Sequence, residues 1–200
     1  IDTPHTEFLE KLYENALEND VPVIRREMQS FLKTFLLIAR PENILEVGTA
    51  VGFSSILMAQ YAPKPCRITT VENYEKRIAE ARKNIPASGF SDIIELIEGD
   101  AADVLKTLVG PYDMIFMDAA KGQYINFLPE VKRLMRPGSI LISDNVLQDG
   151  DIIQSRFVVE RRDRTIHKRM RDYLYTLKHD EELSTSIIPL GDGITISVKR

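Results

Sequence analysis

From Ile44 onward the sequence alternates short apolar runs with longer amphipathic stretches, and this rhythm constrains the fold more than any other feature. Short apolar runs are typical of strands buried on both faces of a parallel sheet, and the stretches between them have helical spacing. Only Gly191-Asp192-Gly193 separates the last two β-rich runs, which is typical of a hairpin. We therefore expect an α/β fold with a doubly wound, mostly parallel seven-stranded Rossmann-like sheet and an antiparallel C-terminal hairpin. The expected strands lie near residues 44–47, 68–71, 93–97, 114–117, 140–143, 184–189 and 194–198.

Apolar stripes at helical spacing predict the helices. Two helices are expected before the first strand, and later helices near residues 74–84, 124–135 and 156–177, with the turn 136–138 ending the second of these. A length of 200 residues suits a single domain, so we expect one domain over 1–200, with N-terminal helices in 1–40 and the Rossmann-like core in 41–200. The stripes are Phe8, Leu9, Leu12 and Ala16; Met28, Phe31, Leu32, Phe35 and Ala39; and Ile166, Met170, Tyr173, Leu174 and Leu177.

Composition narrows the class of protein. An apolar content of 44% with 28% charged residues is ordinary for a globular protein. A net charge of -4 argues against a general nucleic-acid binder, although a local basic patch is compatible with it. One cysteine, Cys66, excludes an internal disulfide, and no apolar run is long enough for a membrane span. We expect a soluble, cytoplasmic protein.

Three successive strand ends carry residues suited to a nucleoside cofactor. The first expected strand leads into the glycine turn Glu46–Ser54, which opens a helix; a pyrophosphate-binding fingerprint would want further glycines at Ala50 and Phe53, so a cofactor without phosphate fits better. Glu72 ends the second strand, where a carboxylate can accept both ribose hydroxyls. Asp100 and Ala101 follow the third, where they could hold an adenine edge. Each turn alone is equally compatible with a plain loop or a helix N-cap.

The next two strand ends carry oxygen ligands. Asp118 ends the fourth strand and Asp144-Asn145 the fifth. Two carboxylates and one amide oxygen form a hard, incomplete ligand set that suits Mg²⁺ with positions open for water and substrate. Lys121 stands beside this set and would accept or relay a substrate proton, or stabilise an oxyanion. Either carboxylate alone could be a helix N-cap.

With these residues the chain resembles the cation-dependent O-methyltransferases, which include catechol and caffeoyl-coenzyme A O-methyltransferases. The resemblance implies a class I methyltransferase fold, S-adenosylmethionine as cofactor and Mg²⁺ or another divalent cation as metal. It implies Asp118, Asp144 and Asn145 as metal ligands and Lys121, with Asp118, as catalytic residues. The cofactor contacts that it implies are Met28, Glu46, Gly48, Ser54, Glu72, Asp100, Ala101 and Asp118. Met28 also belongs to an apolar stripe, so a core role is equally compatible with its position.

Within that family the motifs resemble bacterial tRNA 5-hydroxyuridine methyltransferases, through residues 118–124, 144–147 and 187–193. Ala120 stands where catechol enzymes have a bulky aromatic residue. The implied partner is a tRNA anticodon loop, with phosphates held by one basic face of the late helix; a solvated helix face is the alternative. The residues of that face are Arg161, Arg164, Lys168 and Arg171.

Other functions stay open at this stage. The chain could methylate a small catechol-like or acyl-coenzyme A phenol, or bind the cofactor without catalysis, although the intact Asp118, Lys121, Asp144 and Asn145 count against the latter. The amphipathic N-terminal helices suggest a homodimer.

Overall fold

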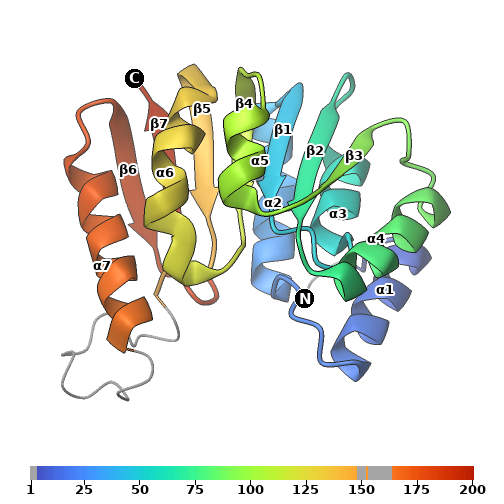
Figure 1. The fold of residues 1–200 in the computed structure, drawn as a ribbon. Coiled ribbons are helices and arrows are strands. Elements are labelled where there is room, and N and C mark those ends of the chain that lie inside the picture. The colour runs from blue at the N-terminus through green and yellow to red at the C-terminus, as the bar shows by residue number, and fades with distance from the viewer. Residues whose placement is uncertain (1–3, 148–151, 153–163) are drawn as a thin grey trace. The chain divides into compact units, whose positions relative to one another are not determined.

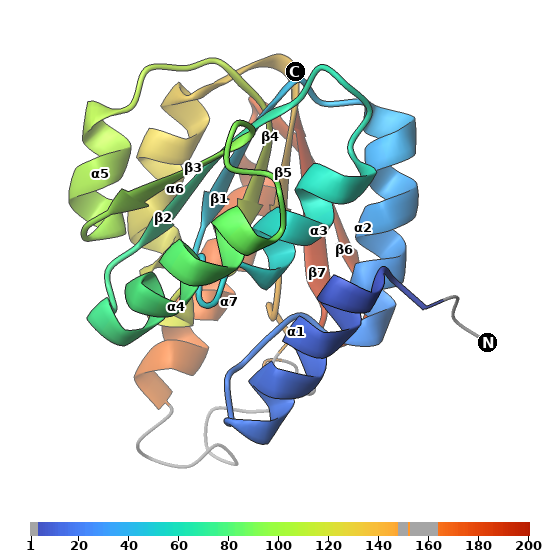
Figure 2. The same cartoon turned by 90° about the vertical axis from the view of Figure 1, so that its right-hand side faces the viewer.

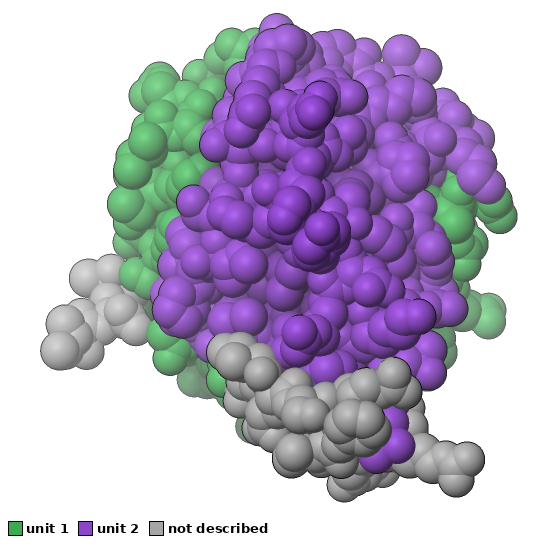
Figure 3. Space-filling view, turned by 90° about the vertical axis from the view of Figure 1, so that its left-hand side faces the viewer, with its two compact units in different colours: residues 1–104 green, residues 105–200 purple. Residues whose placement is uncertain are grey.

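The computed structural model describes residues 4–147, 152 and 164–200. The chain divides into two compact units, Ile1–Val104 and Leu105–Arg200, coloured separately in Figure 3. Strands and helices alternate in both units, as the rhythm of apolar runs predicts. The expected single domain over 1–200 stays a prediction.

The first unit is built around three parallel strands. Strand β2 pairs with β1 on one side and β3 on the other, and the register sets Val47 opposite Val71 and Glu72 opposite Glu98. All three carboxyl ends therefore lie at one edge. Its elements are α1 (Glu7–Glu18), α2 (Arg26–Ala39), β1 (Asn43–Val47), α3 (Phe53–Tyr61), β2 (Arg67–Glu72), α4 (Glu75–Ala87) and β3 (Ile94–Glu98), and α5 (Ala101–Thr107) crosses the unit boundary.

The core of the first unit follows from its apolar runs. Ile44, Leu45 and Val47 of β1 are fully buried, because residues of this run face both sides of the strand layer. Helices α1 and α2 both pack against α3, as Figure 2 shows. Of the predicted N-terminal stripes, Leu9, Leu12, Ala16, Met28 and Leu32 are buried, whereas Phe8, Phe31, Phe35 and Ala39 are only partly covered.

The second unit contains four strands. Strand β4 runs parallel to β5, and β7 lies antiparallel between β5 and β6, so the predicted C-terminal hairpin is present. Helices α6 and α7 lie on the same side of these strands (Figure 1). The elements are β4 (Tyr112–Met117), the short 3-10 helix η1 (Lys121–Gln123), α6 (Tyr124–Arg133), β5 (Met135–Ser143), α7 (Arg164–His179), β6 (Leu183–Ile188) and β7 (Ile194–Lys199).

Two details of the second unit differ from the sequence expectation. The predicted helix 124–135 and turn 136–138 are wrong at their ends, because α6 stops at Arg133 and β5 already begins at Met135. Met135 pairs with Tyr112 before a register irregularity, and this pairing satisfies backbone groups that a turn would leave to water. Ile166 is 38% exposed instead of lying in the buried stripe, since it lies over Gly122 of η1, and His167 takes the buried position. The part of the late helix before Arg164 lies outside the described residues.

No helix among the described residues has the length and apolar content needed to cross a membrane.

Candidate active site

The turn after β1 rests on a buried polar group. Glu46 is fully buried, and its Oε2 accepts a hydrogen bond from Thr70 Oγ1 at 2.5 Å. Thr70 Oγ1 in turn lies 2.6 Å from Thr49 Oγ1. A buried carboxylate is stable only when it is hydrogen-bonded, so the two threonines keep Glu46 beneath the turn. Its expected contact with a cofactor stays a prediction.

Glu72 joins the turn after β1 to the end of β2. Its Oε2 accepts the backbone N–H of Ala50 at 2.8 Å, and its Oε1 accepts those of Asn73 and Tyr74, each at 2.9 Å. The turn reaches Glu72 because Gly48 (φ 106°) and Ala50 (φ 46°) adopt left-handed conformations. A carboxylate offers about four acceptor sites, so Glu72 keeps capacity for a ribose hydroxyl.

The other expected cofactor residues of the first unit lie on the elements that the motifs predict. Asp100 Oδ1 accepts the N–H of Ala102 at 2.8 Å, so this exposed carboxylate also begins α5 as an N-cap. Ala101 is half-buried, and Ser54 is buried in the first turn of α3. Met28 is 2% exposed, which is the burial of a core residue. None of these positions by itself tests cofactor binding.

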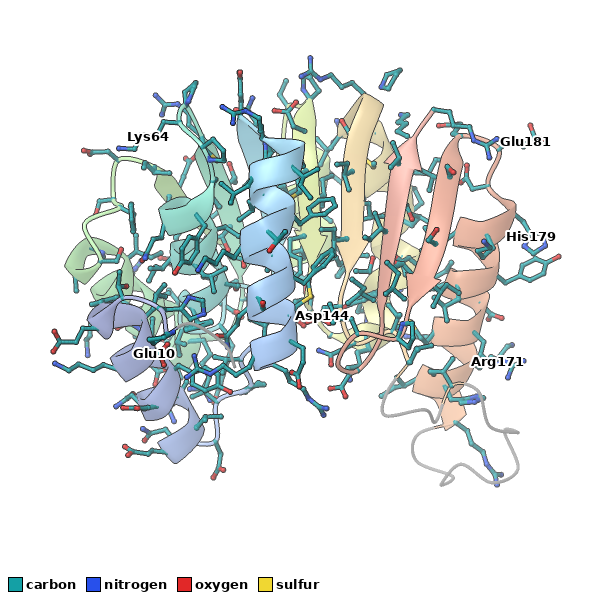
Figure 4. The ribbon with its side chains drawn as sticks, turned by 180° about the vertical axis from the view of Figure 1, so that it is seen from behind. Glu10, Lys64, Asp144, Arg171, His179 and Glu181 are labelled. Carbon is teal, nitrogen blue, oxygen red and sulfur yellow. The ribbon has the colours of Figure 1, made fainter. Side chains whose placement is uncertain are left out.

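In the second unit the predicted metal ligands come together at the ends of β4 and β5. Asn145 Nδ2 lies 3.2 Å from Asp118 Oδ1, and the backbone N–H of Asn145 donates to Asp144 Oδ1 at 2.7 Å. Asn145 has φ 60°, a left-handed conformation that asparagine tolerates better than most residues. Asp144 is buried, and Figure 4 labels it. Two carboxylates and a carboxamide are therefore close neighbours.

The electrostatics of this cluster fit a cation. Burial, the charge of Asp118 and the charge of Asp192 raise the pKa of Asp144 to about 7. Burial also raises the pKa of Asp118, and the Asn145 amide and Lys121 oppose that shift. A divalent cation would favour both ionised carboxylates. No three His, Cys, Asp or Glu side chains in the described residues gather as a metal-binding group, so a metal here would need the Asn145 carboxamide oxygen.

Lys121 lies in η1, directly after the Asp118 strand end, and its charge acts on both Asp118 and Asp144. Helix α7 holds this short helix in place: Arg169 Nη1 donates to the Gly122 carbonyl at 3.2 Å. The motif that contains Lys121 did not predict the contact between Arg169 and Gly122, because Arg169 is distant in sequence and belongs to a basic run.

Two other supporting contacts were not expected from the sequence. The Tyr124 hydroxyl lies 3.1 Å from both the Met117 and the Asp144 carbonyl oxygens, so it joins the ends of β4 and β5 just where the ligands begin. A Cβ atom on Gly193 would collide with the Leu147 side chain, and the Gly193 carbonyl accepts the Val146 N–H at 2.9 Å. The hairpin glycine therefore lets the C-terminal loop close on the segment after Asn145. Both residues stand in motifs already noted for resemblance.

The predicted nucleic-acid contacts are only partly described. Lys168 and Arg171 are exposed and Arg164 is half-buried on α7, whereas Arg161 lies outside the described residues. The buried face of α7 is the opposite one, formed by His167, Met170, Tyr173, Leu174 and Leu177.

Known proteins match this chain over its length. The model of a family described as O-methyltransferase matches residues 2–200. A catechol O-methyltransferase of Niastella koreensis is 40% identical over 127 residues, which are 62% of this chain and 58% of that protein. The chain thus spans little more than half the length of that relative.

Solved structures agree in fold. A provisionally assigned caffeoyl-CoA O-methyltransferase of Staphylococcus aureus superposes with a TM-score of 0.90 at 33% identity, covering 96% of this chain and 92% of the other. An O-methyltransferase of Bacillus cereus in complex with SAH gives 0.88 at 26% identity, covering 100% and 94%. The expected fold class, a mostly parallel seven-stranded Rossmann-like sheet with an antiparallel terminal hairpin, is confirmed.

Proposed function

Because this chain belongs to the O-methyltransferase family, we propose that it transfers a methyl group from S-adenosylmethionine to a 5-hydroxyuridine at the wobble position of tRNA, with the help of Mg²⁺. The product would be 5-methoxyuridine. One observation carries this proposal most directly: Asp118, Asp144 and Asn145 lie together in the second unit, with Lys121 acting on both carboxylates.

The donor set suits a hard cation. Asp118, Asp144 and the Asn145 carboxamide oxygen would hold Mg²⁺. When bound, the ion would lower the pKa of a substrate hydroxyl beside it. In the described structure the Asn145 amide nitrogen faces Asp118. Rotation of that amide would present its oxygen instead, and nitrogen and oxygen occupy equivalent positions in the group. Tyr124 would keep the ends of β4 and β5 in register for these ligands.

The reaction itself asks little of the protein beyond positioning. The substrate oxygen attacks the methyl carbon of S-adenosylmethionine, the bond between that carbon and sulfur breaks, and the electron pair stays on sulfur in S-adenosylhomocysteine. The hydroxyl proton passes to Lys121 Nζ or to water; in the former role Lys121 acts as general base, in the latter its charge stabilises the oxyanion. Glu72 would hold the cofactor ribose and so fix the cofactor in one orientation.

Charge on α7 favours an RNA substrate. This helix carries five lysines and arginines and one acidic residue, although the whole chain has a net charge of -4. Exposed cations on one helix face can bind phosphates. A 5-hydroxyuridine also presents its hydroxyl beside the O4 carbonyl, so its two neighbouring oxygens match an ion that binds vicinal oxygens.

A small phenol is the second candidate substrate, and it rests on the relatives. The Niastella koreensis protein is named as a catechol O-methyltransferase, and a catechol offers the same pair of neighbouring oxygens. Against it, the exposed Ala120 stands beside the ligands in place of a side chain that could wall a small flat ring.

A homodimer is the oligomeric state that we propose, with α2 at its interface. Phe31 and Phe35 stack with ring centroids 5.2 Å apart, and Leu37 and Ile38 are 56% and 74% exposed. Contiguous apolar side chains on a helix surface are typical of an interface. Size-exclusion chromatography with light scattering should give twice the chain mass, and Ile38→Asp should give the monomer.

The test of the reaction is methyl transfer from labelled S-adenosylmethionine to tRNA prepared from cells that lack this enzyme, with Mg²⁺ or EDTA, followed by mass spectrometry of the nucleosides. Metal-dependent 5-methoxyuridine supports the proposal. Absence of label in tRNA together with metal-dependent labelling of catechols would replace it by the small-molecule candidate.

A further inference from the structure

The outer face of α7 carries more than positive charge. A spacing of three or four residues sets side chains along one side of a helix. On α7, basic residues near the start of the helix and an aromatic pair near its end follow this spacing and lie along one side. We call this set the α7 stripe: Arg164, Lys168, Arg171, Tyr175 and His179. At about 1.5 Å per residue the stripe is roughly 22 Å long.

The aromatic pair has the geometry of a platform. The rings of Tyr175 and His179 stack with centroids 3.9 Å apart at an interplanar angle of 21°. His179 Nδ1 lies 2.8 Å from the Tyr175 carbonyl oxygen, which fixes the imidazole against the phenol ring. Tyr175 nevertheless stays 66% exposed, since His179 covers only one of its faces. The other face is open to solvent.

Two cations of the stripe, Lys168 and Arg171, are available to a ligand. In the described residues Lys168 and Arg171 form no ion pair; Arg171 donates only to the Ile152 carbonyl, at 3.3 Å. Helix α4 is the contrasting case, because its Arg77 pairs with Glu80 and its Arg82 with Glu98. Asp172 is the one acidic residue of α7 and lies beside the stripe. Figure 4 shows Arg171 and His179 on α7 at the margin of the second unit.

We propose that Tyr175, backed by His179, is a stacking platform for an unpaired base of the substrate RNA, and that Lys168 and Arg171 bind the phosphates leading to it. Aromatic faces bind single-stranded bases without regard to sequence, and cations along the backbone supply the remaining attraction. The platform lies at the end of this path, because no cation of the stripe follows His179 and the acidic Glu181 lies two residues beyond it. The inference rests on the proposed function in taking RNA as the substrate.

Binding and catalysis are measured separately, so that the two proposals fail in different ways. Binding is measured as the Kd from the fluorescence anisotropy of a fluorescein-labelled anticodon stem-loop RNA, with a fully paired duplex RNA as the second probe. Catalysis is methyl transfer to tRNA and to free 5-hydroxyuridine. The variants are Tyr175→Ala, Tyr175→Phe and Lys168→Ala, and Lys83→Ala on α4 is the matched control for loss of an exposed helical lysine.

We expect Tyr175→Ala to weaken stem-loop binding by about 5- to 100-fold, the range of one lost base stack, and to leave duplex binding unchanged. Tyr175→Phe keeps the ring and should bind like the parent protein. Lys168→Ala should lower the slope of log Kd against log salt by about 0.7 to 0.9, whereas Lys83→Ala should not. The KM for tRNA should rise with Kd, and turnover of free 5-hydroxyuridine should stay constant.

Two results would overturn the platform: no stem-loop binding by the parent protein, or equal binding by the parent protein and a folded Tyr175→Ala variant. If Tyr175→Ala lowers only the melting temperature, the stacked pair stabilises α7 and does no more. Tyr175-dependent binding without methylation of tRNA would keep the platform and remove the wobble uridine as substrate.

Discussion

Within the described residues, Glu72 of the first unit accepts three backbone N–H groups, whereas Asp144 of the second unit accepts one and faces the charges of Asp118 and Asp192. The first carboxylate is satisfied by the fold around it. The second has its pKa raised to about 7, because neighbouring charges and burial disfavour ionisation. This contrast separates a carboxylate held by backbone N–H groups from a carboxylate that the proposed cation would stabilise in its ionised form.

Replacing a carboxylate of the proposed metal site should have the largest effect. Asp144→Asn keeps the shape of the side chain and an oxygen that accepts the Asn145 N–H, but it removes one negative charge. We expect methyl transfer to fall at least roughly 100-fold, since metal assistance is worth several kcal/mol. In EDTA the melting temperature should stay constant or rise, because a buried repulsion disappears. Asp113→Asn, at the other end of β4, is the control.

A fall in the melting temperature of Asp144→Asn in EDTA would contradict the difference between Glu72 and Asp144. It would mean that the surroundings stabilise the ionised Asp144 as they stabilise Glu72.

Replacing Glu72 should act on the cofactor and not on the metal. Glu72→Ala removes the acceptor of the Ala50, Asn73 and Tyr74 N–H groups and, in the proposed complex, the acceptor of a ribose hydroxyl. We expect the Kd for S-adenosylmethionine, measured by calorimetry, to rise about 10- to 100-fold, the value of one or two hydrogen bonds to a charged group. Glu98→Ala, at the neighbouring strand end, should leave it constant. A change in Mg²⁺ affinity in Glu72→Ala would contradict the separation.

The pH dependence of metal affinity should show the raised pKa of Asp144. Below about pH 7 the metal must displace a proton from Asp144, so the association constant for Mg²⁺ should rise about tenfold per pH unit and level off above it.

Without metal, a rise in pH should lower the stability of the folded protein. An unfolded aspartate ionises at its ordinary pKa of 3.8, so between about pH 4 and 7 the folded state holds more protons than the unfolded state. The free energy of unfolding in EDTA should therefore decrease as pH rises through this window. A denaturant titration at several pH values measures it, and a flat profile would exclude the raised pKa.

The smallest effect is expected at Arg169. Arg169→Ala removes the hydrogen bond to the Gly122 carbonyl and loosens the helix that carries Lys121. We expect kcat to fall about 3- to 10-fold, the value of one net hydrogen bond, with the Kd for cofactor unchanged. Arg169→Lys keeps the charge without the guanidinium fork and should behave like Arg169→Ala. If Arg169→Lys has the same kcat as the parent protein, the charge of Arg169 supports catalysis and its hydrogen bond to Gly122 does not.

Motifs identified the strand ends well, but not what supports them. The runs that became β1 and β4 were predictable because residues buried on both faces leave a continuous apolar signal. Asp118 and Asp144-Asn145 were predicted to meet because parallel neighbours end at one edge, and their hydrogen bonds agree. Arg169 and the hydroxyl of Tyr124 were missed, since a hydrogen bond to a backbone carbonyl leaves no signature in sequence.

Sequence by itself determined the alternation of strands and helices and the C-terminal hairpin, because these depend on local periodicity and on turn residues. Tertiary structure alone decided that Met135 begins a strand, that His167 and not Ile166 is buried, and that Asp144 is close enough to Asp118 and Asp192 for its pKa to rise. The reason is physical: burial and electrostatic shifts depend on distances between groups that are remote in the chain, and no local pattern encodes those distances.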